Sequence, residues 1–495
     1  MRSRGAPAVA VLAAVTIVLT GCSGSSSKAT APTTTAPAST AVSTAAPTTT
    51  STTAPSAQEQ AAVGAAFSRF ETAIAAASSV AELSTFGAGA QGHKDADGFV
   101  QQVAQADLET ELVAADPDHP ELLRDPDPFT VPPGDPPDRS GIYNPDNLNY
   151  VAVVSGQAEY RITGTRGNSA DLTFQAVSGF PGDGSVGKPT GLVPLNQLHV
   201  GAGGSYTVDI GPTSSPGNWL PTVPATSVIA VRDTFANWAG AAPDHLTITR
   251  VGVTSPPLTH LSAAQLAAAL DRAANDVVVQ SKYWSGFWAG LLSHIGVNSL
   301  IAPATTQSGL QNQVSVLGHF RLAPGEALVV TVARSAAAYQ GFEVADPFGQ
   351  TLPYATHESS LTAAQAVVAG DGLIHYVVSA TDPGVPNWID TEGRGEGFLF
   401  LRWQGLSGRL SPSQYPKTTV VRLSALTTQL PSGTPTVTPS QRAQQLAARQ
   451  ADLAARIQAS SDDAATVLRP ELLQLAADVG QGKVDALFGS AAWRS

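Results

Sequence analysis

Residues 217–220 read Gly-Asn-Trp-Leu, and residues 386–389 read Pro-Asn-Trp-Ile. An apolar run follows each stretch and ends in an arginine, Arg232 in the first case and Arg402 in the second. A glycine also precedes each stretch at the same distance to within one residue. Matching motifs in matching order indicate an internal duplication. A looser similarity links Phe174-Gln175 with residues 339–342.

Short runs of β-branched and aromatic residues, separated by turns, fill the first copy. They are residues 150–154, 159–163, 171–174, 205–208 and 227–232. Strands of this length and spacing are typical of a β-sandwich or jelly roll. We therefore expect an α+β chain that is mainly β, with two sandwich-like domains at residues 140–253 and 314–426.

Helical patterns precede, separate and follow the two copies. Ser56 with Glu59, and Ser262 with Gln265, have the spacing of capping boxes ahead of apolar residues at helical intervals. The aromatic residues at 284–288 are expected to pack on a β-domain rather than on a membrane, since few cations flank them. We expect helical regions at residues 56–139, 254–313 and 427–495. Within the last, residues 446–457 and 472–479 are expected to form a helical hairpin.

The N-terminus resembles a bacterial lipoprotein signal peptide. Residues 1–21 contain two arginines, an apolar stretch too short to span a bilayer, and Leu-Thr-Gly directly before Cys22. Cys22 is therefore the predicted lipidation site, which would anchor the protein on the extracytoplasmic face of the cell membrane. Residues 22–55, rich in Ser, Thr, Pro and Ala, are expected to form a disordered tether.

The composition excludes several classes of function. One cysteine in 495 residues leaves no internal disulfide, iron–sulfur cluster or multi-thiolate zinc site. A net charge of −12 without a basic run argues against nucleic-acid binding. The nine histidines lack metal-binding spacing, and the acidic residues between Asp107 and Asp138 are interpreted as a solvated loop. We predict neither a metal nor a cofactor.

Residues 382–391 read Asp-Pro-Gly-Val-Pro-Asn-Trp-Ile-Asp-Thr. With residues 144–150 and the pair Arg402-Trp403, this string resembles a family of uncharacterised actinobacterial proteins. They are related to bacterial proteins that carry two tandem β-rich domains of unknown function. The resemblance covers about residues 95–426 and implies a jelly-roll-like fold without an agreed activity. The family string usually continues with Gly-His, whereas this chain has Glu-Gly-Arg-Gly at residues 392–395.

There are four candidate site residues here: Asn387, Trp388 and Asp390 lie within the string, and Arg402 follows it. As a ligand site, the indole would stack on a ring and the arginine would hold a carboxylate or hydroxyl. As a structural feature, Asp390 would pair with Arg402, Asn387 would brace the turn, and Trp388 would close the end of the sandwich. Both interpretations remain open from the sequence.

The first copy offers Asn218, Trp219 and Arg232 as counterparts, with Pro221 in place of the acidic residue. We expect a lipid-anchored envelope protein that binds a small molecule or glycan through its β-domains. The alternative is an envelope hydrolase or lyase whose distributed site would use His357 with Asp390 and Arg402. The chain has no G-x-S-x-G sequence around a serine nucleophile, and whether it is an enzyme is left open.

Overall fold

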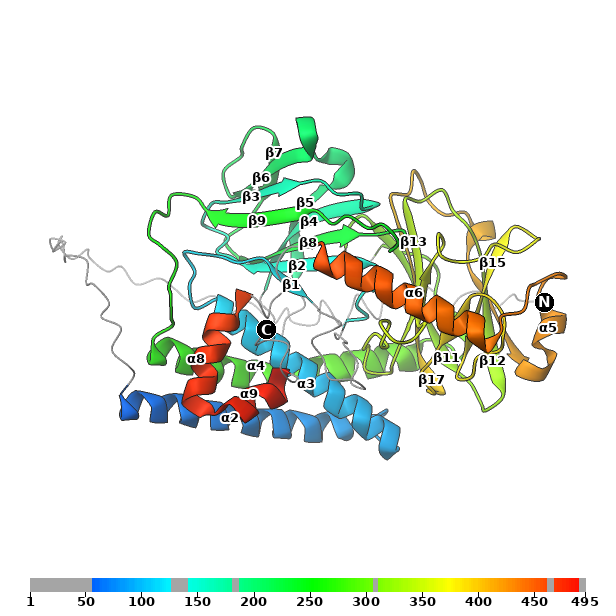
Figure 1. The fold of residues 1–495 in the computed structure, drawn as a ribbon, viewed down its shortest axis with the longest axis horizontal. Helices are drawn as coiled ribbons and strands as arrows, with labels where there is room; N and C mark the ends of the chain where they lie inside the picture. The colour runs from blue at the N-terminus through cyan, green and yellow to red at the C-terminus, as the bar shows by residue number, and fades with distance from the viewer. Residues whose placement is uncertain (1–55, 126–140, 180–186, 306–309, 461–466, 489–495) are drawn as a thin grey trace, which may run out of the picture.

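The computed structural model describes residues 56–125, 141–179, 187–305, 310–460 and 467–488. The predicted signal peptide, Cys22 and the tether lie outside these residues, as do the acidic-loop residues 126–140. Within the described residues, the chain forms two β-modules and a group of helices (Figure 1).

The first β-module consists of two facing sheets. Its five-stranded sheet has the order β1-β2-β8-β4-β5, and its four-stranded sheet has the order β7-β6-β3-β9. The strands are β1 (Leu123–Asp125), β2 (Asn147–Val153), β3 (Tyr160–Thr165), β4 (Asp171–Ser178), β5 (Lys188–Pro194), β6 (Ser205–Gly211), β7 (Asn218–Pro221), β8 (Thr226–Thr234) and β9 (His245–Arg250).

The second β-module repeats this arrangement strand for strand. Its sheets have the orders β10-β11-β17-β13-β14 and β16-β15-β12-β18, so each strand number is that of the first module plus nine. The strands are β10 (Ser299–Leu300), β11 (Gln313–Arg321), β12 (Glu326–Ala333), β13 (Tyr339–Ala345), β14 (Ser360–Thr362), β15 (Leu373–Ser379), β16 (Trp388–Asp390), β17 (Glu396–Gln404) and β18 (Lys417–Arg422). The predicted α+β fold with duplicated sandwiches is confirmed.

Alternation along the strands builds the core of each sandwich. In β8, Ile229 and Val231 point into the first core, and in β17, Leu399 and Leu401 point into the second. The residues between them, including Arg232 and Arg402, therefore lie on the outer faces of the five-stranded sheets. The edge strands β1 and β10 begin before residues 140 and 314, where the sequence placed the two domains.

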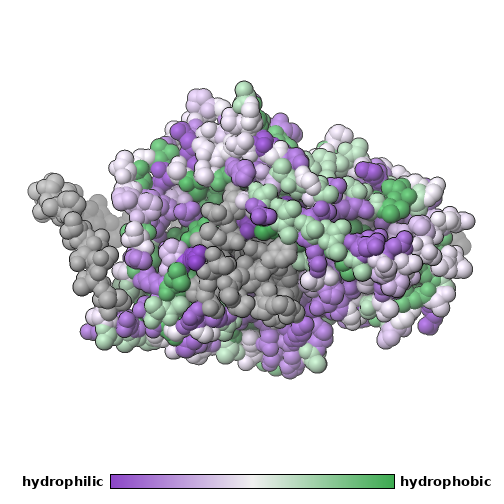
Figure 2. All heavy atoms as spheres, viewed as in Figure 1, coloured by the Kyte–Doolittle hydropathy of each residue, from purple (hydrophilic) through white to green (hydrophobic). Residues whose placement is uncertain are grey.

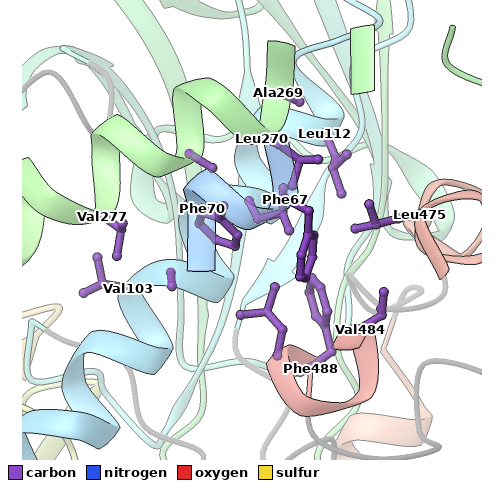
Figure 3. Packing of buried hydrophobic residues seen from close by; sticks show 14 of the residues in the cluster. Phe67, Phe70, Val103, Leu112, Ala269, Leu270, Val277, Leu475, Val484 and Phe488 are labelled. Carbon is purple, nitrogen blue, oxygen red and sulfur yellow. The ribbon is translucent and has the colours of Figure 1, made fainter. Parts of the chain in front are cut away.

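Three long helices, α2 (Ala57–Glu82), α3 (Gly89–Val113) and α4 (Ala263–His294), pack together with α8 (Arg469–Val479) and α9 (Gln481–Phe488). Figure 3 shows their shared core, in which Phe67 and Phe70 of α2 meet Leu270 of α4 and Leu475 of α8. Both predicted capping boxes are present, at Ser56 and at Ser262.

The aromatic side of α4 packs on the second module, as predicted. Trp288 lies edge-on to Phe398 of β17, with ring centroids 5.4 Å apart, and Leu292 is fully buried in the same cluster. No helix among the described residues is long and apolar enough to cross a membrane. On the face shown in Figure 2, apolar residues are scattered in small groups among polar ones.

The prediction that the two C-terminal helices form a hairpin is wrong. Helix α6 (Pro439–Gln458), which follows the short α5 (Leu426–Gln429), lies across both β-modules, whereas α8 joins the helical group (Figure 1). Leu453 of α6 belongs to the core of the first module, and Leu472 of α8 to the helical core. The buried side of α6 also carries arginines, so its apolar pattern alone did not identify its partner.

Candidate functional site

Asn387 and Trp388 brace the backbone of the second module. The Asn387 side chain accepts a hydrogen bond from the Val367 amide at 2.7 Å and donates one to the Val367 carbonyl at 2.8 Å. The Trp388 indole is 7% exposed, and its Nε1 donates to the carbonyl of Ser379 at 3.0 Å. Neither side chain is available to a ligand in this arrangement.

Asn218 and Trp219 make the same contacts in the first module. Asn218 bonds to the amide and carbonyl of His199 at 2.7 and 2.9 Å, and Trp219 Nε1 donates to the Gly211 carbonyl at 3.1 Å. In each module, these bonds hold a short parallel strand, β7 or β16, against its neighbour. The repetition favours the structural interpretation of the Asn-Trp motif.

A small cavity of about 120 Å³ lies beside Asn387. It is lined in part by His375, Leu430 and Pro435, and His375 is paired with Asp371 at 3.0 Å. Pockets that enclose a drug-sized ligand are about 300–1,000 Å³, so this cavity suits a few water molecules rather than a sugar ring.

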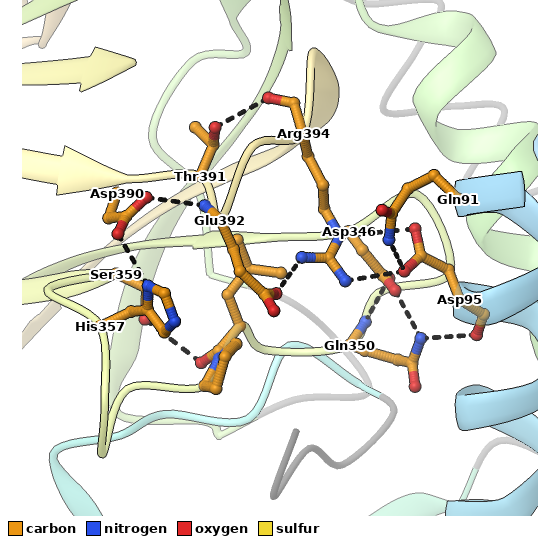
Figure 4. A network of polar contacts seen from close by, with 12 residues as sticks. Gln91, Asp95, Asp346, Gln350, His357, Ser359, Asp390, Thr391, Glu392 and Arg394 are labelled. Atoms are coloured by element: carbon orange, nitrogen blue, oxygen red, sulfur yellow. Dashed lines mark hydrogen bonds and ion pairs between the residues drawn. The ribbon is translucent and has the colours of Figure 1, made fainter. Parts of the chain in front are cut away.

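His357 and Asp390 meet, as the enzyme hypothesis required (Figure 4). His357 Nδ1 lies 2.7 Å from Asp390 Oδ2, and the other Asp390 oxygen accepts from the Glu392 amide at 2.8 Å. The hydrogen bond to Asp390 raises the pKa of His357, while partial burial opposes the rise. The imidazole keeps 34% of its surface exposed.

The same region connects the second module to α3. Arg394 Nη2 donates to Asp95 Oδ1 of α3 at 2.7 Å, and both side chains are almost fully buried (Figure 4). Burial and the neighbouring Asp95 raise the pKa of Asp346 to about 8, while Arg394 opposes the rise. Residues 392–395 thus take part in a contact between the second module and α3.

Arg402 does not pair with Asp390, which corrects one structural expectation and removes Arg402 from the proposed His357 site. Its guanidinium contacts the Glu343 carboxylate and the Ile142 carbonyl, and its Cζ lies 3.8 Å above the centre of the Phe400 ring. The reason is topological. Asp390 belongs to the four-stranded sheet, whereas Arg402 points from the outer face of the five-stranded one.

Arg232 occupies the corresponding position of the first module. It stands opposite Thr173 of β4, as Arg402 stands opposite Gly341 of β13. Two residues further along these strands, Gln175 of β4 lies opposite Ala230 of β8 in the first module. At the same place in the second module, Glu343 of β13 lies opposite Phe400 of β17. Glu343 and Phe400, the two side chains that contact Arg402, are therefore replaced by Gln175 and Ala230 around Arg232.

Arg232 has no hydrogen-bond or ion-pair partner among the described residues, and its Nη1 is buried. Burial lowers the pKa of the guanidinium; Tyr143 opposes this, and the like charge of Arg402 adds to it. An unpaired cation that is half-buried in a protein is costly unless something else neutralises it.

Other polar atoms around this position also lack partners. The two modules meet here: Asn312 donates to Asp171 at 2.9 Å, and the Tyr339 hydroxyl donates to Asp146 at 2.8 Å. Buried polar atoms without partners, all on or next to the outer faces of the five-stranded sheets, are Gln175 Oε1, Thr234 Oγ1, Asn312 Oδ1, Glu343 Oε2 and Gln404 Oε1. Each of these oxygens has an acceptor site that water or a polar ligand could fill.

Sequence reasoning identified Arg232 and Arg402 but not Gln175 or Glu343. Within the described residues, no group of three histidine, cysteine, aspartate or glutamate side chains could hold a metal ion.

Comparison with known proteins shows likenesses to solved structures. The chain is similar to an uncharacterised protein from Burkholderia cenocepacia, with 27% identity and a TM-score of 0.64, over 74% of this chain and 99% of that one. A protein from Vibrio parahaemolyticus matches with 10% identity and a TM-score of 0.35, over 57% of this chain and 90% of that one. No family model and no curated protein matches the chain. The first of these likenesses is thus to a bacterial protein described as uncharacterised.

Proposed function

We propose that this protein is a lipid-anchored actinobacterial envelope protein that binds a small carboxylate ligand between its β-modules. The observation that carries the proposal is the unpaired Arg232. In the second module the same position is neutralised by Glu343, and in the first that glutamate is replaced by Gln175. An external carboxylate would supply the missing charge through bidentate hydrogen bonds, which a guanidinium favours.

The surroundings of Arg232 support a small polar ligand rather than a polymer. Arg232 is half-buried, and the nearby side chains of Gln175 and Thr234 are buried with unpartnered oxygens. A glycan chain would require an extended open surface, whereas the polar oxygens of Gln175 and Thr234 are buried.

Anchoring through Cys22 is the second part of the proposal, and it is supported by the Leu-Thr-Gly-Cys sequence at residues 19–22. The Cys22→Ser variant expressed in an actinobacterial host should leave the membrane fraction. If it stays there as the wild type does, the anchor assignment fails.

Ligand binding is tested on the purified mature chain by thermal unfolding in the presence of acetate, succinate, benzoate, chloride or phosphate. We expect carboxylates to raise the midpoint temperature at millimolar concentration and Arg232→Gln to remove the effect. Arg161→Gln is the matched control, because Arg161 is exposed on β3 and pairs with Asp209. If no carboxylate acts, or if Arg232→Gln responds like the wild type, the proposal is wrong.

One observation favours a second candidate function, hydrolysis or a lyase reaction. Asp390 holds Nδ1 of His357, which leaves Nε2 free to accept a proton as a general base does. Among the described residues, no serine, threonine or cysteine side chain is hydrogen-bonded to this histidine, so water or a substrate carbon would have to be the proton donor. Screening esters, glycosides and uronates with wild type and His357→Gln tests this candidate, and activity unaffected by the substitution would exclude His357.

A further inference from the structure

Besides the Ile142 carbonyl, two side chains contact the guanidinium of Arg402 in the second module, and they are different in kind. Glu343 provides a carboxylate, and Phe400 provides a flat ring whose centre lies 3.8 Å from Cζ. The glutamate and the phenylalanine face each other across β13 and β17. Arg402 is thus paired at its edge and stacked on its face, which are the two favoured contacts of a guanidinium.

Arg232 lacks the ring as well as the carboxylate. Ala230 takes the position of Phe400, so the first module has no aromatic side chain at this position. Ala230, Arg232 and Val151, which lies beside Ala230 on β2, all keep part of their surface exposed. The outer face of the first module is therefore partly accessible to solvent at the position where Phe400 packs in the second module.

From this difference between the repeats, we propose that the ligand is an aromatic carboxylate. Its carboxylate would take the role of Glu343 toward Arg232, and its ring would lie over Ala230 against the guanidinium face, as Phe400 lies against Arg402. This inference rests on the proposed carboxylate site and adds the class of the ligand. No covalent step is involved.

The wild-type protein tests the inference directly by calorimetric titration with four probes: benzoate, cyclohexanecarboxylate, acetate and benzamide. Benzoate should bind about tenfold more tightly than acetate, since stacking on a desolvated guanidinium contributes roughly that factor. Cyclohexanecarboxylate should be weaker than benzoate because its ring is not planar, and benzamide should be weakest because it has no charge.

Two substitutions rebuild the second module's arrangement at Arg232. Ala230→Phe should abolish the advantage of benzoate over acetate, because the new ring occupies the space of the ligand's ring. Gln175→Glu should weaken all carboxylates at least tenfold, because the internal carboxylate takes their place. Val420→Phe adds a ring at an exposed position of β18 and should leave binding unchanged.

The outcomes separate the two proposals. If acetate and benzoate bind Arg232-dependently with equal affinity, the aromatic ligand is excluded and the carboxylate site stands. If benzoate remains tighter than acetate in Ala230→Phe, the ring does not lie over Ala230 and the inference fails. If no carboxylate binds the wild type, both proposals fail.

Discussion

Arg232 and Arg402 hold the same position in the two β-modules, yet within the part of the chain that the structure describes only Arg402 is hydrogen-bonded to a carboxylate. The register of β4 with β8 and of β13 with β17 makes this equivalence independent of any sequence alignment. One copy of the repeat therefore shows which partners this arginine requires, and the other copy shows their absence. The same comparison can be made in any duplicated fold in which a polar side chain has its partners in one repeat and lacks them in the other.

The buried Glu343–Arg402 pair predicts a large stability effect. Glu343→Gln would leave Arg402 buried without a counter-charge, and breaking such a pair costs about 3–5 kcal/mol. Urea unfolding of the variant should show this loss in the free energy of unfolding. Glu326→Gln, at a partly exposed position of β12, is the control. A loss below 1 kcal/mol would mean that the pair is not needed for folding.

The reverse substitution in the first module should be stabilising. Gln175→Glu places a carboxylate where Glu343 stands in the second repeat, so that Arg232 gains an internal partner. Hydrogen bonds to charged groups contribute about 1.5–3 kcal/mol, and the cost of burying the new charge brings the expected gain to the lower part of that range. Thermal unfolding without ligand measures it, and Gln175→Ala controls for loss of the amide. If Gln175→Glu is less stable than the wild type, residue 175 is not equivalent to Glu343 in its contact with the arginine.

Much of the fold follows from local sequence patterns. Alternating strands such as β8 and capped helices such as α4 are specified by contacts near in sequence, and the Asn-Trp motif revealed the duplication. The edge strands β1 and β10 have three and two residues, too few for a pattern to be visible. The prediction of a hairpin was wrong because α6 buries Arg442, Arg449 and Arg456, and arginine side chains are usually exposed to water.

The candidate site was harder to predict, because its chemistry depends on strand register. Asp390 and Arg402 are close in sequence but belong to different sheets. Gln175 and Glu343 become significant only when Phe174 is aligned with Phe342, as the register requires. The weak similarity of Phe174-Gln175 to residues 339–342 was the one sequence signal for this alignment. It did not show which residue of the second copy corresponds to Phe174.

The two tryptophans of the repeated motif should behave alike. Trp388→Phe and Trp219→Phe each remove one hydrogen bond from indole to a main-chain carbonyl, so each should cost about 1 kcal/mol of stability. Neither should alter carboxylate binding, because both indoles contact the four-stranded sheets rather than Arg232. Unfolding and titration of both variants check this. A loss of binding in either variant would restore the tryptophan to the ligand site.

The buried contact between Arg394 and Asp95 should couple α3 to the second module. Arg394→Gln and Asp95→Asn should each destabilise the protein by about 1.5–3 kcal/mol, since each removes a buried charged hydrogen bond while Arg394 keeps Glu392 and Asp95 keeps Gln91 as partners. The double variant should lose less than the sum of the two single losses, because the two residues act on each other. Chemical unfolding of all four proteins measures this coupling, and additive losses would show that the contact contributes nothing of its own.

The His357–Asp390 pair predicts a pH dependence of stability with a definite sign. Because the hydrogen bond to Asp390 raises the folded pKa of His357 above its ordinary 6.5, folding favours the protonated imidazole. The resulting stabilisation is fully present below pH 6.5 and is lost as the pH rises through the higher folded pKa. The difference in unfolding free energy between wild type and Asp390→Asn should therefore shrink from pH 6 to pH 8. His245→Gln, an exposed position on β9, should show no such trend. A difference that grows with pH would mean that His357 is held neutral in the folded protein, and the assigned proton would then lie elsewhere.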